Sequence, residues 1–164
     1  DTIDSLNQEL GKDLQLLLSQ GEGPRLEFKS SFRWDMRQNQ ANKALEVVIL
    51  KTIAGFMNGD GGTLLIGVSD DGAISGLKRD YSLLKKSDAD GFEQAIVTVV
   101  STNLGADLCQ FLHIVFHPIV GEDCFPIISN PIPRPVYLNC NGGLRPYPRT
   151  GASTRDRNRQ DAAE

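Results

Sequence analysis

The chain has few cysteines, and their arrangement predicts no structural cross-link. Its three cysteines, Cys109, Cys124 and Cys140, are odd in number, and no Cys-x-x-Cys pair occurs. A disulfide framework or a zinc site is therefore not expected. A reducing environment, and so a cytoplasmic location, fits this cysteine usage best.

The chain also lacks any long hydrophobic run. No apolar stretch approaches the ~20 residues of a transmembrane helix, so we expect no membrane contact from this segment. The first ten residues, DTIDSLNQEL, are polar and acidic, unlike a signal peptide. Because the sequence starts with Asp1 rather than Met, we expect it to be part of a longer protein. Its 164 residues suit one domain with one hydrophobic core.

A phosphate-binding loop is missing as well. The segment 58–63, NGDGGT, lacks the Gly-Lys-Ser/Thr ending of a P-loop. It also follows a predicted helix rather than opening one, so free helix N-terminal amides would not face a phosphate there. We expect these glycines to form a tight helix-to-strand turn, and we expect no nucleotide cofactor.

Positive charge is scarce overall but concentrated towards the C-terminus. The formal charge of −4 disfavours nucleic acid as a partner. Residues 134–159, however, contain six arginines and one aspartate, a local charge of +5 that leaves −9 for the rest. Such a region is either an electrostatic footprint for phosphate or a solvated tail.

Hydrophobic periodicity predicts an α+β fold, a mostly antiparallel sheet packed with helices. The predicted helices cover 3–19, 41–58 and 87–105, the last with Ser87 as its N-cap. The predicted strands are 24–30, a hairpin over 62–77, 109–120, an edge strand at 124–129 that contains a proline, and strands at 134–140 and 144–150. Residues 31–40 have no clear period and are interpreted as a loop.

The first predicted strand, 24–30, alternates between two kinds of side chain. Leu26 and Phe28 would point towards a core, whereas Glu27 and Lys29 would point towards solvent. Glu22 precedes a Gly-Pro bend at the start of this strand.

Three carboxylates could meet at one end of the predicted sheet. If 24–30 and the strand before Asp70 are neighbours, Glu22, Glu27 and Asp70 can converge. Such oxygen ligands suit Mg²⁺ or Mn²⁺, which assist phosphodiester cleavage, and Lys29 could contact the phosphate. The alternative is an exposed strand surface together with ordinary turn chemistry at Asp70.

The C-terminal segment mixes aromatic and cationic residues. Tyr137 and Tyr147 alternate with Arg145, Arg149 and Arg155. Stacking surface and cations of this kind serve nucleic-acid backbones and unpaired bases. An ordinary edge strand followed by a helix cap explains the same pattern.

Four segments in this order resemble the Schlafen AlbA-like family, also called a DNA-binding domain family and earlier a divergent AAA domain. The segments are LEFKSS (26–31), GFMN (55–58), GGTLLIGVSDDGAISGL (61–77) and YPRTGASTR (147–155). The resemblance runs from about residue 20 to residue 156. It predicts an N-terminal helix at 1–20, the AlbA-like domain at 21–156 and a polar tail at 157–164.

The resemblance implies an α+β fold and association with DNA or RNA, in bacteria often within transcriptional regulators. Similar domains of animal Schlafen proteins are metal-dependent endoribonucleases that act on structured RNA such as tRNA. Their carboxylate triad matches Glu22, Glu27 and Asp70, with Lys29 following as it does there. Those nucleases pair two such domains around the RNA, so a comparable groove would need a homodimer here. Their zinc-binding Cys/His set is missing from this chain.

Three functions are therefore open. The first is a nucleic-acid-binding domain whose phosphate contacts would come from Arg25, Lys29, Arg33, Arg145, Arg149 and Arg155. The second is an Mg²⁺- or Mn²⁺-dependent endoribonuclease with Glu22, Glu27 and Asp70 as metal ligands. The third is a protein–protein interaction module suited to the acidic body of the chain.

Overall fold

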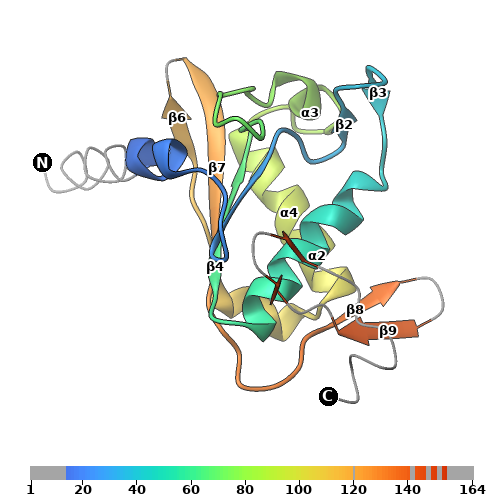
Figure 1. The fold of residues 1–164 in the computed structure, drawn as a ribbon. Coiled ribbons are helices and arrows are strands. Elements are labelled where there is room, and N and C mark those ends of the chain that lie inside the picture. Colours follow the sequence, from blue (N-terminus) through green and yellow to red (C-terminus); the bar gives the residue numbers. More distant parts are fainter. Residues whose placement is uncertain (1–13, 120, 141–142, 147–148, 151–152, 155–164) are drawn as a thin grey trace, which may run out of the picture.

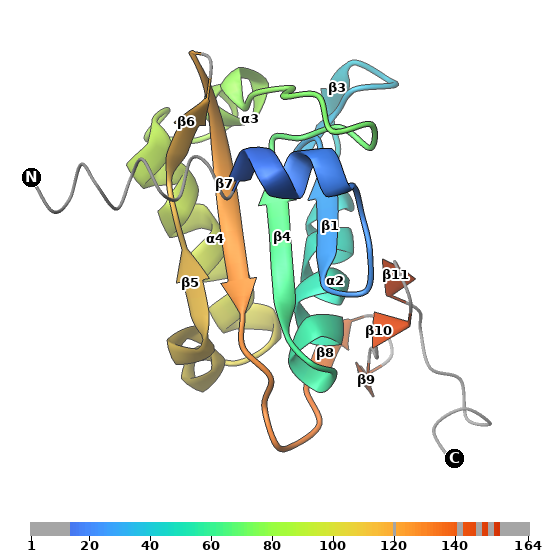
Figure 2. The same cartoon turned by 60° about the vertical axis from the view of Figure 1, so that its left-hand side comes forward.

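A mixed β-sheet forms the centre of the molecule, and helices cover both of its faces (Figures 1 and 2). The computed structural model describes residues 14–119, 121–140, 143–146, 149–150 and 153–154. The sheet strands are β1 (Leu26–Lys29), β4 (Gly62–Ile66), β5 (Leu112–Ile114), β6 (His117–Ile119) and β7 (Glu122–Ser129). The helices are residues 14–20, α2 (Leu45–Asn58), α3 (Lys78–Ser82), α4 (Ala89–Asn103) and the 3₁₀ helix η1 (Ala106–Phe111).

Three small hairpins lie outside this sheet. They are formed by β2 (Trp34–Asp35) with β3 (Gln40–Ala41), β8 (Tyr137–Cys140) with β9 (Gly143–Pro146), and β10 (Arg149–Thr150) with β11 (Ser153–Thr154). The β10–β11 hairpin packs beside α2. Ser153 and Thr154 form β11, and the residues that would follow the alternative helix cap lie outside the described residues.

The strand order is β1-β4-β7-β5, and β6 extends the pairing along β7. β1 and β4 are parallel, whereas β4, β5 and β6 all pair with β7 in the antiparallel sense. The predicted α+β fold with a mostly antiparallel sheet is confirmed. The parallel pair requires a crossover connection, and α2 provides it between β1 and β4.

The two faces of the sheet carry separate hydrophobic clusters. Leu64 and Ile66 of β4 face α2 and α4 in the larger cluster, whereas Leu65 faces the helix at 14–20. Figure 2 shows this N-terminal helix in front of the sheet and α2 and α4 behind it. The alternation follows from the two-residue period of a strand that is buried on both faces. Among the described residues, no helix is long and apolar enough to cross a membrane.

The glycine-rich segment after α2 forms the predicted tight turn. Gly61 has a φ of 79°, in the left-handed region that favours glycine, and its N–H donates to the Phe56 carbonyl at 2.8 Å. A Cβ on Gly62 would lie 2.4 Å from the Phe56 ring. These glycines therefore let β4 start directly under the last turn of α2.

The predicted hairpin over 62–77 is wrong in its second half. Residues 73–77 form no strand, and their sheet contact is one isolated bridge between Val68 and Ile74. β1 and β7 occupy the two edges of β4, so a returning strand has no free edge on which to pair.

The predicted edge position of 124–129 is also wrong, because β7 lies inside the sheet between β4 and β5. Pro126 has no N–H to donate, yet it pairs opposite Leu65. The Pro126 carbonyl accepts from Val115 at 2.9 Å, so its backbone polar groups face the β5–β6 side. The missing donor coincides with the interruption between β5 and β6, and no ladder bond to β4 is lost.

Two boundaries also differ from expectation. Asp88, not Ser87, caps α4: its carboxylate accepts the Gly91 N–H at 2.8 Å. The strand expected at 109–120 starts as a 3₁₀ helix and then divides into β5 and β6.

Candidate functional site

Glu22 closes the outer edge of β1. β1 is the edge strand of the sheet, so its outward N–H groups have no neighbouring strand. The Glu22 carboxylate accepts the backbone N–H of Phe28 at 2.9 Å, and Gly23 exchanges two backbone hydrogen bonds with Leu26. The Gly-Pro bend thus folds residues 22–23 back along the strand, as expected from the sequence, and gives Glu22 a structural contact.

Glu27 does not lie on a solvent-facing surface, contrary to the prediction from strand alternation. Its relative exposure is 6%, and it points from β1 towards α2. The hydroxyl of Thr52 on α2 donates to Glu27 Oε2 at 2.6 Å, and Lys29 Nζ lies 4.0 Å from Glu27 Oε1. Because α2 covers this face of β1, Glu27 makes a buried polar contact with α2 instead of facing solvent.

Asp70 lies in the exposed turn after β4. The prediction that its strand neighbours β1 is confirmed, because Gly67 N–H donates to the Lys29 carbonyl at 2.7 Å. The carboxylates themselves do not form a group: among the described residues, no three His, Cys, Asp or Glu side chains are placed to hold a metal ion. The assignment of Glu22, Glu27 and Asp70 as ligands of Mg²⁺ or Mn²⁺ stays a prediction.

Two of the predicted phosphate-binding residues, Arg25 and Arg33, lie beyond opposite ends of β1. Arg25 is exposed where β1 begins, whereas Arg33 lies beyond the other end of that strand. Arg145 lies on β9 and Arg149 on β10, where the structure describes the backbone alone. Arg155 is outside the described residues.

The expected loop at 31–40 is instead a short antiparallel hairpin, so that interpretation is wrong. Trp34 pairs with Ala41 and Asp35 with Gln40. The Asp35 carboxylate accepts the N–H groups of Arg37 and Gln38 at 2.9 and 3.0 Å. The N–H of Gln38, the largest contribution, helps to lower the Asp35 pKa, because these bonds favour the ionised carboxylate. A two-residue ladder offers too little alternation to be recognised in a sequence.

A buried carboxylate on α3 holds the hairpin in place. Asp80 is 2% exposed and accepts the backbone N–H groups of three consecutive residues, Phe32, Arg33 and Trp34, at 3.1, 2.6 and 3.0 Å. Burial outweighs these bonds and raises the pKa of Asp80 above its ordinary value. α3 is itself anchored to β7 by the Tyr81 hydroxyl, which donates to the Asp123 carboxylate at 2.6 Å.

Two arginines at this end lie over aromatic rings. The Arg33 guanidinium is 4.9 Å from the Phe32 ring centroid and 3.1 Å from the Glu46 carboxylate. The Arg79 guanidinium is 5.1 Å from the Trp34 ring centroid and donates to the Asn39 side chain at 3.1 Å. The rings attract the guanidinium groups and so restrict their positions.

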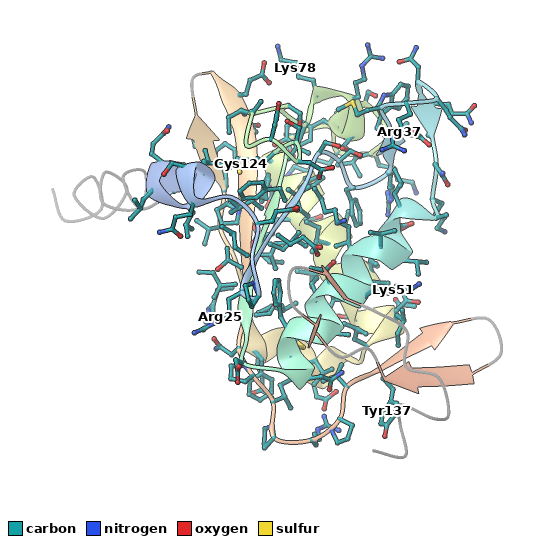
Figure 3. All side chains as sticks on the ribbon, viewed as in Figure 1. Arg25, Arg37, Lys51, Lys78, Cys124 and Tyr137 are labelled. Atoms are coloured by element: carbon teal, nitrogen blue, oxygen red, sulfur yellow. The ribbon has the colours of Figure 1, made fainter. Side chains whose placement is uncertain are left out.

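We call the exposed side of the β2–β3 hairpin and α3 the hairpin surface; its members are Arg33, Trp34, Arg37, Lys43, Lys78 and Arg79. Figures 1 and 2 both place α3 and β3 at one end of the molecule. Figure 3 shows Arg37 and Lys78 at that end and Arg25 well away from it. Within the described part of the chain, the side chains of Arg37, Lys43 and Arg79 form no ion pair with a carboxylate. The charge of Arg37 still adds, after the N–H of Gln38, to the lowering of the Asp35 pKa.

Comparison with family models identifies the family of this chain. The model described as Schlafen, AlbA_2 matches residues 22–155, which is most of the sequence. The chain belongs to the Schlafen AlbA_2 family. No curated protein matches the chain.

Solved structures share the fold of this Schlafen AlbA_2 domain at low sequence identity. The DIP2311 protein from Corynebacterium diphtheriae matches with a TM-score of 0.61 at 18% identity, over 94% of this chain and 27% of that one. The N-terminal domain of a protein from Nitrosomonas europaea, named as related to the ATP-dependent DNA helicase RecG, matches with a TM-score of 0.53 at 20% identity. That match covers 88% of this chain and 92% of the other. The chain thus spans 27% of the Corynebacterium protein.

Sequence reasoning on this Schlafen AlbA_2 domain missed most of the hairpin surface. Of its six members, Arg33 alone was among the predicted phosphate contacts. The available signal was local: SFRWDMRQNQANK holds three cations and one tryptophan within thirteen residues. The contact with Asp80, 46 positions beyond Trp34, has no counterpart in the sequence pattern.

Proposed function

We propose that this domain binds nucleic acid and that the hairpin surface makes the main contact. The observation that carries the proposal is the group Arg37, Lys43 and Arg79. Arg37 lies in the turn of the hairpin, Lys43 just after β3, and Arg79 over the Trp34 ring. None of the three forms an ion pair with a carboxylate in the described structure. In a chain of formal charge −4, such a local concentration of positive charge suits phosphate and is otherwise costly through mutual repulsion.

The architecture supports this proposal. Asp80 ties the hairpin backbone to α3, and Tyr81 ties α3 to the sheet, so the cations are presented on a rigid base. A preorganised surface loses less conformational entropy when it binds. The family assignment, and the likeness to a domain of a protein named for a DNA helicase, agree with a nucleic-acid ligand.

The test is fluorescence anisotropy with labelled single-stranded and duplex DNA and RNA at rising salt. Backbone phosphate contacts release counterions, so log Kd should rise linearly with log salt, by roughly 0.7 to 0.9 per phosphate contacted. We expect binding to one or more of these ligands at low salt, with a slope that indicates about three contacts or more. Absence of binding to all four ligands at low salt would overturn the proposal.

The second candidate, a metal-dependent endoribonuclease, rests on one observation. β1 and β4 are parallel neighbours, so Glu27 and the turn carrying Asp70 belong to adjacent strands of the same sheet. Asp70 is the informative position, because it is exposed and Asp70→Asn should leave the free energy of unfolding within about 0.5 kcal/mol. If the chain cleaves a labelled tRNA in Mn²⁺, this variant should abolish cleavage. Undiminished cleavage would exclude Asp70 as a metal ligand.

A further inference from the structure

A pocket opens beside the hairpin surface. Its volume is about 340 Å³, and Arg33, Ala41, Lys43 and Leu83 line it. Ligand pockets in proteins span about 300 to 1,000 Å³, so this one suits a single small unit rather than an extended ligand. The lining combines two cations with two apolar side chains.

Contacts with neighbouring residues restrain Arg33 at this pocket. Its backbone is fixed by Asp80, its guanidinium lies over the Phe32 ring, and one terminal nitrogen binds Glu46. A guanidinium has five N–H donors. The Nε of Arg33 is buried and has no hydrogen-bond partner among the described residues. Glu46 therefore orients Arg33 without using all its donors.

The remaining lining residues complete a mixed site. Lys43 is exposed and adds a second positive charge, so Arg33 and Lys43 together exceed the single carboxylate of Glu46. Leu83 is 36% exposed, and Ala41 on β3 is also exposed. The two apolar side chains offer a surface on which the flat face of a base could pack.

We propose, building on the proposed nucleic-acid binding, that this pocket accepts one unpaired nucleotide of a single strand. The phosphate contacts Arg33 and Lys43, and the base lies against Leu83 and Ala41. A duplex cannot use such a site fully, because its base faces are stacked on one another, which leaves the backbone and the base edges in the grooves accessible. The domain therefore prefers single-stranded over duplex nucleic acid.

The fluorescence of Trp34 can be used to follow binding of a nucleotide in this pocket. Trp34 is the one tryptophan of the chain, and it adjoins Arg33 in the sequence. Its emission can be followed while the protein is titrated with a ten-nucleotide DNA strand, and then with the same sequence as a blunt duplex. The single strand should bind at least about tenfold more tightly, a ratio that purely electrostatic binding would not produce.

Two matched pairs of variants locate the contact. Leu83→Ser is compared with Val97→Ser on α4, because the two side chains have similar exposure, 36% and 39%, and Val97 does not line the pocket. Lys43→Ala is compared with Lys85→Ala, another exposed lysine that does not line it. We expect Leu83→Ser and Lys43→Ala each to weaken single-strand binding by roughly three- to tenfold. The two control variants should change it less than twofold.

The outcomes separate this inference from the function on which it rests. If the wild type binds neither strand nor duplex, nucleic-acid binding itself fails and this inference fails with it. If both bind equally and Leu83→Ser has no effect while Arg37→Glu weakens both, binding stands and the nucleotide pocket is overturned. Circular dichroism confirms that each variant is folded, which the exposed positions of all four side chains should ensure.

Discussion

The Asp80 carboxylate accepts the backbone N–H of Trp34 at 3.0 Å, although the two residues are 46 positions apart in the sequence. The same carboxylate also accepts from Phe32 and Arg33. One buried side chain of α3 thereby fixes the start of the hairpin that carries most of the cations of the hairpin surface. Stability and the proposed function should depend on it together.

Asp80→Ala should destabilise the protein and weaken nucleic-acid binding. The substitution leaves three backbone N–H groups without their acceptor, and one buried unsatisfied donor costs about 1 to 3 kcal/mol. We expect a loss of about 3 kcal/mol in the free energy of unfolding by urea denaturation. Asp71→Ala is the control: Asp71 is exposed, its bonds stay within its own turn, and its loss should cost less than about 1 kcal/mol. Equal effects of the two variants would contradict the role of Asp80.

The ionisation of Asp80 should contribute to the pH dependence of the protein's stability. Burial raises the pKa of Asp80 in the folded protein above its unfolded value, so the folded state holds this proton more tightly. The contribution to stability is therefore full below the unfolded pKa and is lost as the pH rises through the folded pKa. Comparison with Asp80→Asn isolates the contribution of this carboxyl group. As the pH rises from about 4 to about 7, the stability of the wild type relative to this variant should fall. A relative stability that rises with pH would show that the three N–H bonds outweigh burial.

Cys124 should resist thiol reagents until the protein unfolds. It is fully buried, and burial raises the pKa of its thiol to about 12, so almost no thiolate is present near neutral pH. The thiolate is the reactive species. Alkylation at pH 8 followed by peptide mapping resolves the three cysteines, and partly buried Cys109 serves as the internal comparison. Cys109 should react at least about tenfold faster than Cys124 in the native protein, and the difference should vanish in denaturant.

Glu27 and Thr52 should be energetically coupled. Their 2.6 Å hydrogen bond is buried and joins β1 to α2. A double-mutant cycle with Glu27→Gln and Thr52→Val should give a coupling energy of about 1 to 2 kcal/mol. The control cycle pairs Thr52→Val with Glu46→Gln, whose side chains bind different partners in the described structure, and should be additive within about 0.5 kcal/mol. Additivity in both cycles would contradict the structural role of Glu27.

This coupling also bears on the nuclease hypothesis. Loss of activity in a Glu27 variant would not identify a metal ligand, because the same change removes a buried contact between β1 and α2. Because Asp70 is exposed, a loss of activity in an Asp70 variant is easier to attribute to catalysis than to a loss of stability.

Much of the fold was predictable from the sequence where one periodic pattern dominates. α2 is apolar at helical spacing, β1 alternates apolar and charged side chains after a proline, and β4 is a short apolar run that follows glycines, so each was recognised. The errors concern how strands are paired. Pro126 indicated an edge strand, yet its missing N–H coincides with the interruption between β5 and β6. No local pattern carries that information.

The types of residue at the candidate site could be predicted from the sequence, but their positions relative to one another could not. Alternation placed Glu27 on a charged face of β1, but α2 covers that face and Thr52 binds the carboxylate. The cations of the hairpin surface come from segments separated in the sequence, such as Arg37 on the hairpin and Arg79 on α3. The two segments lie side by side because Asp80 binds the hairpin backbone and Arg79 binds the Asn39 side chain. Side chains brought together by one tertiary contact leave no spacing rule in the sequence.

The most direct test of the central claim compares charge reversal at two exposed arginines, Arg37 on the hairpin surface and Arg25 at the start of β1 (Figure 3). Both lie on the same chain and undergo the same change, so net charge is matched. Anisotropy with a labelled single strand at low salt should show Arg37→Glu binding about tenfold more weakly, with its salt slope reduced by about 1, and Arg25→Glu within twofold of the wild type. Equal weakening by the two variants, or loss with Arg25→Glu alone, would contradict the hairpin surface as the site of nucleic-acid binding.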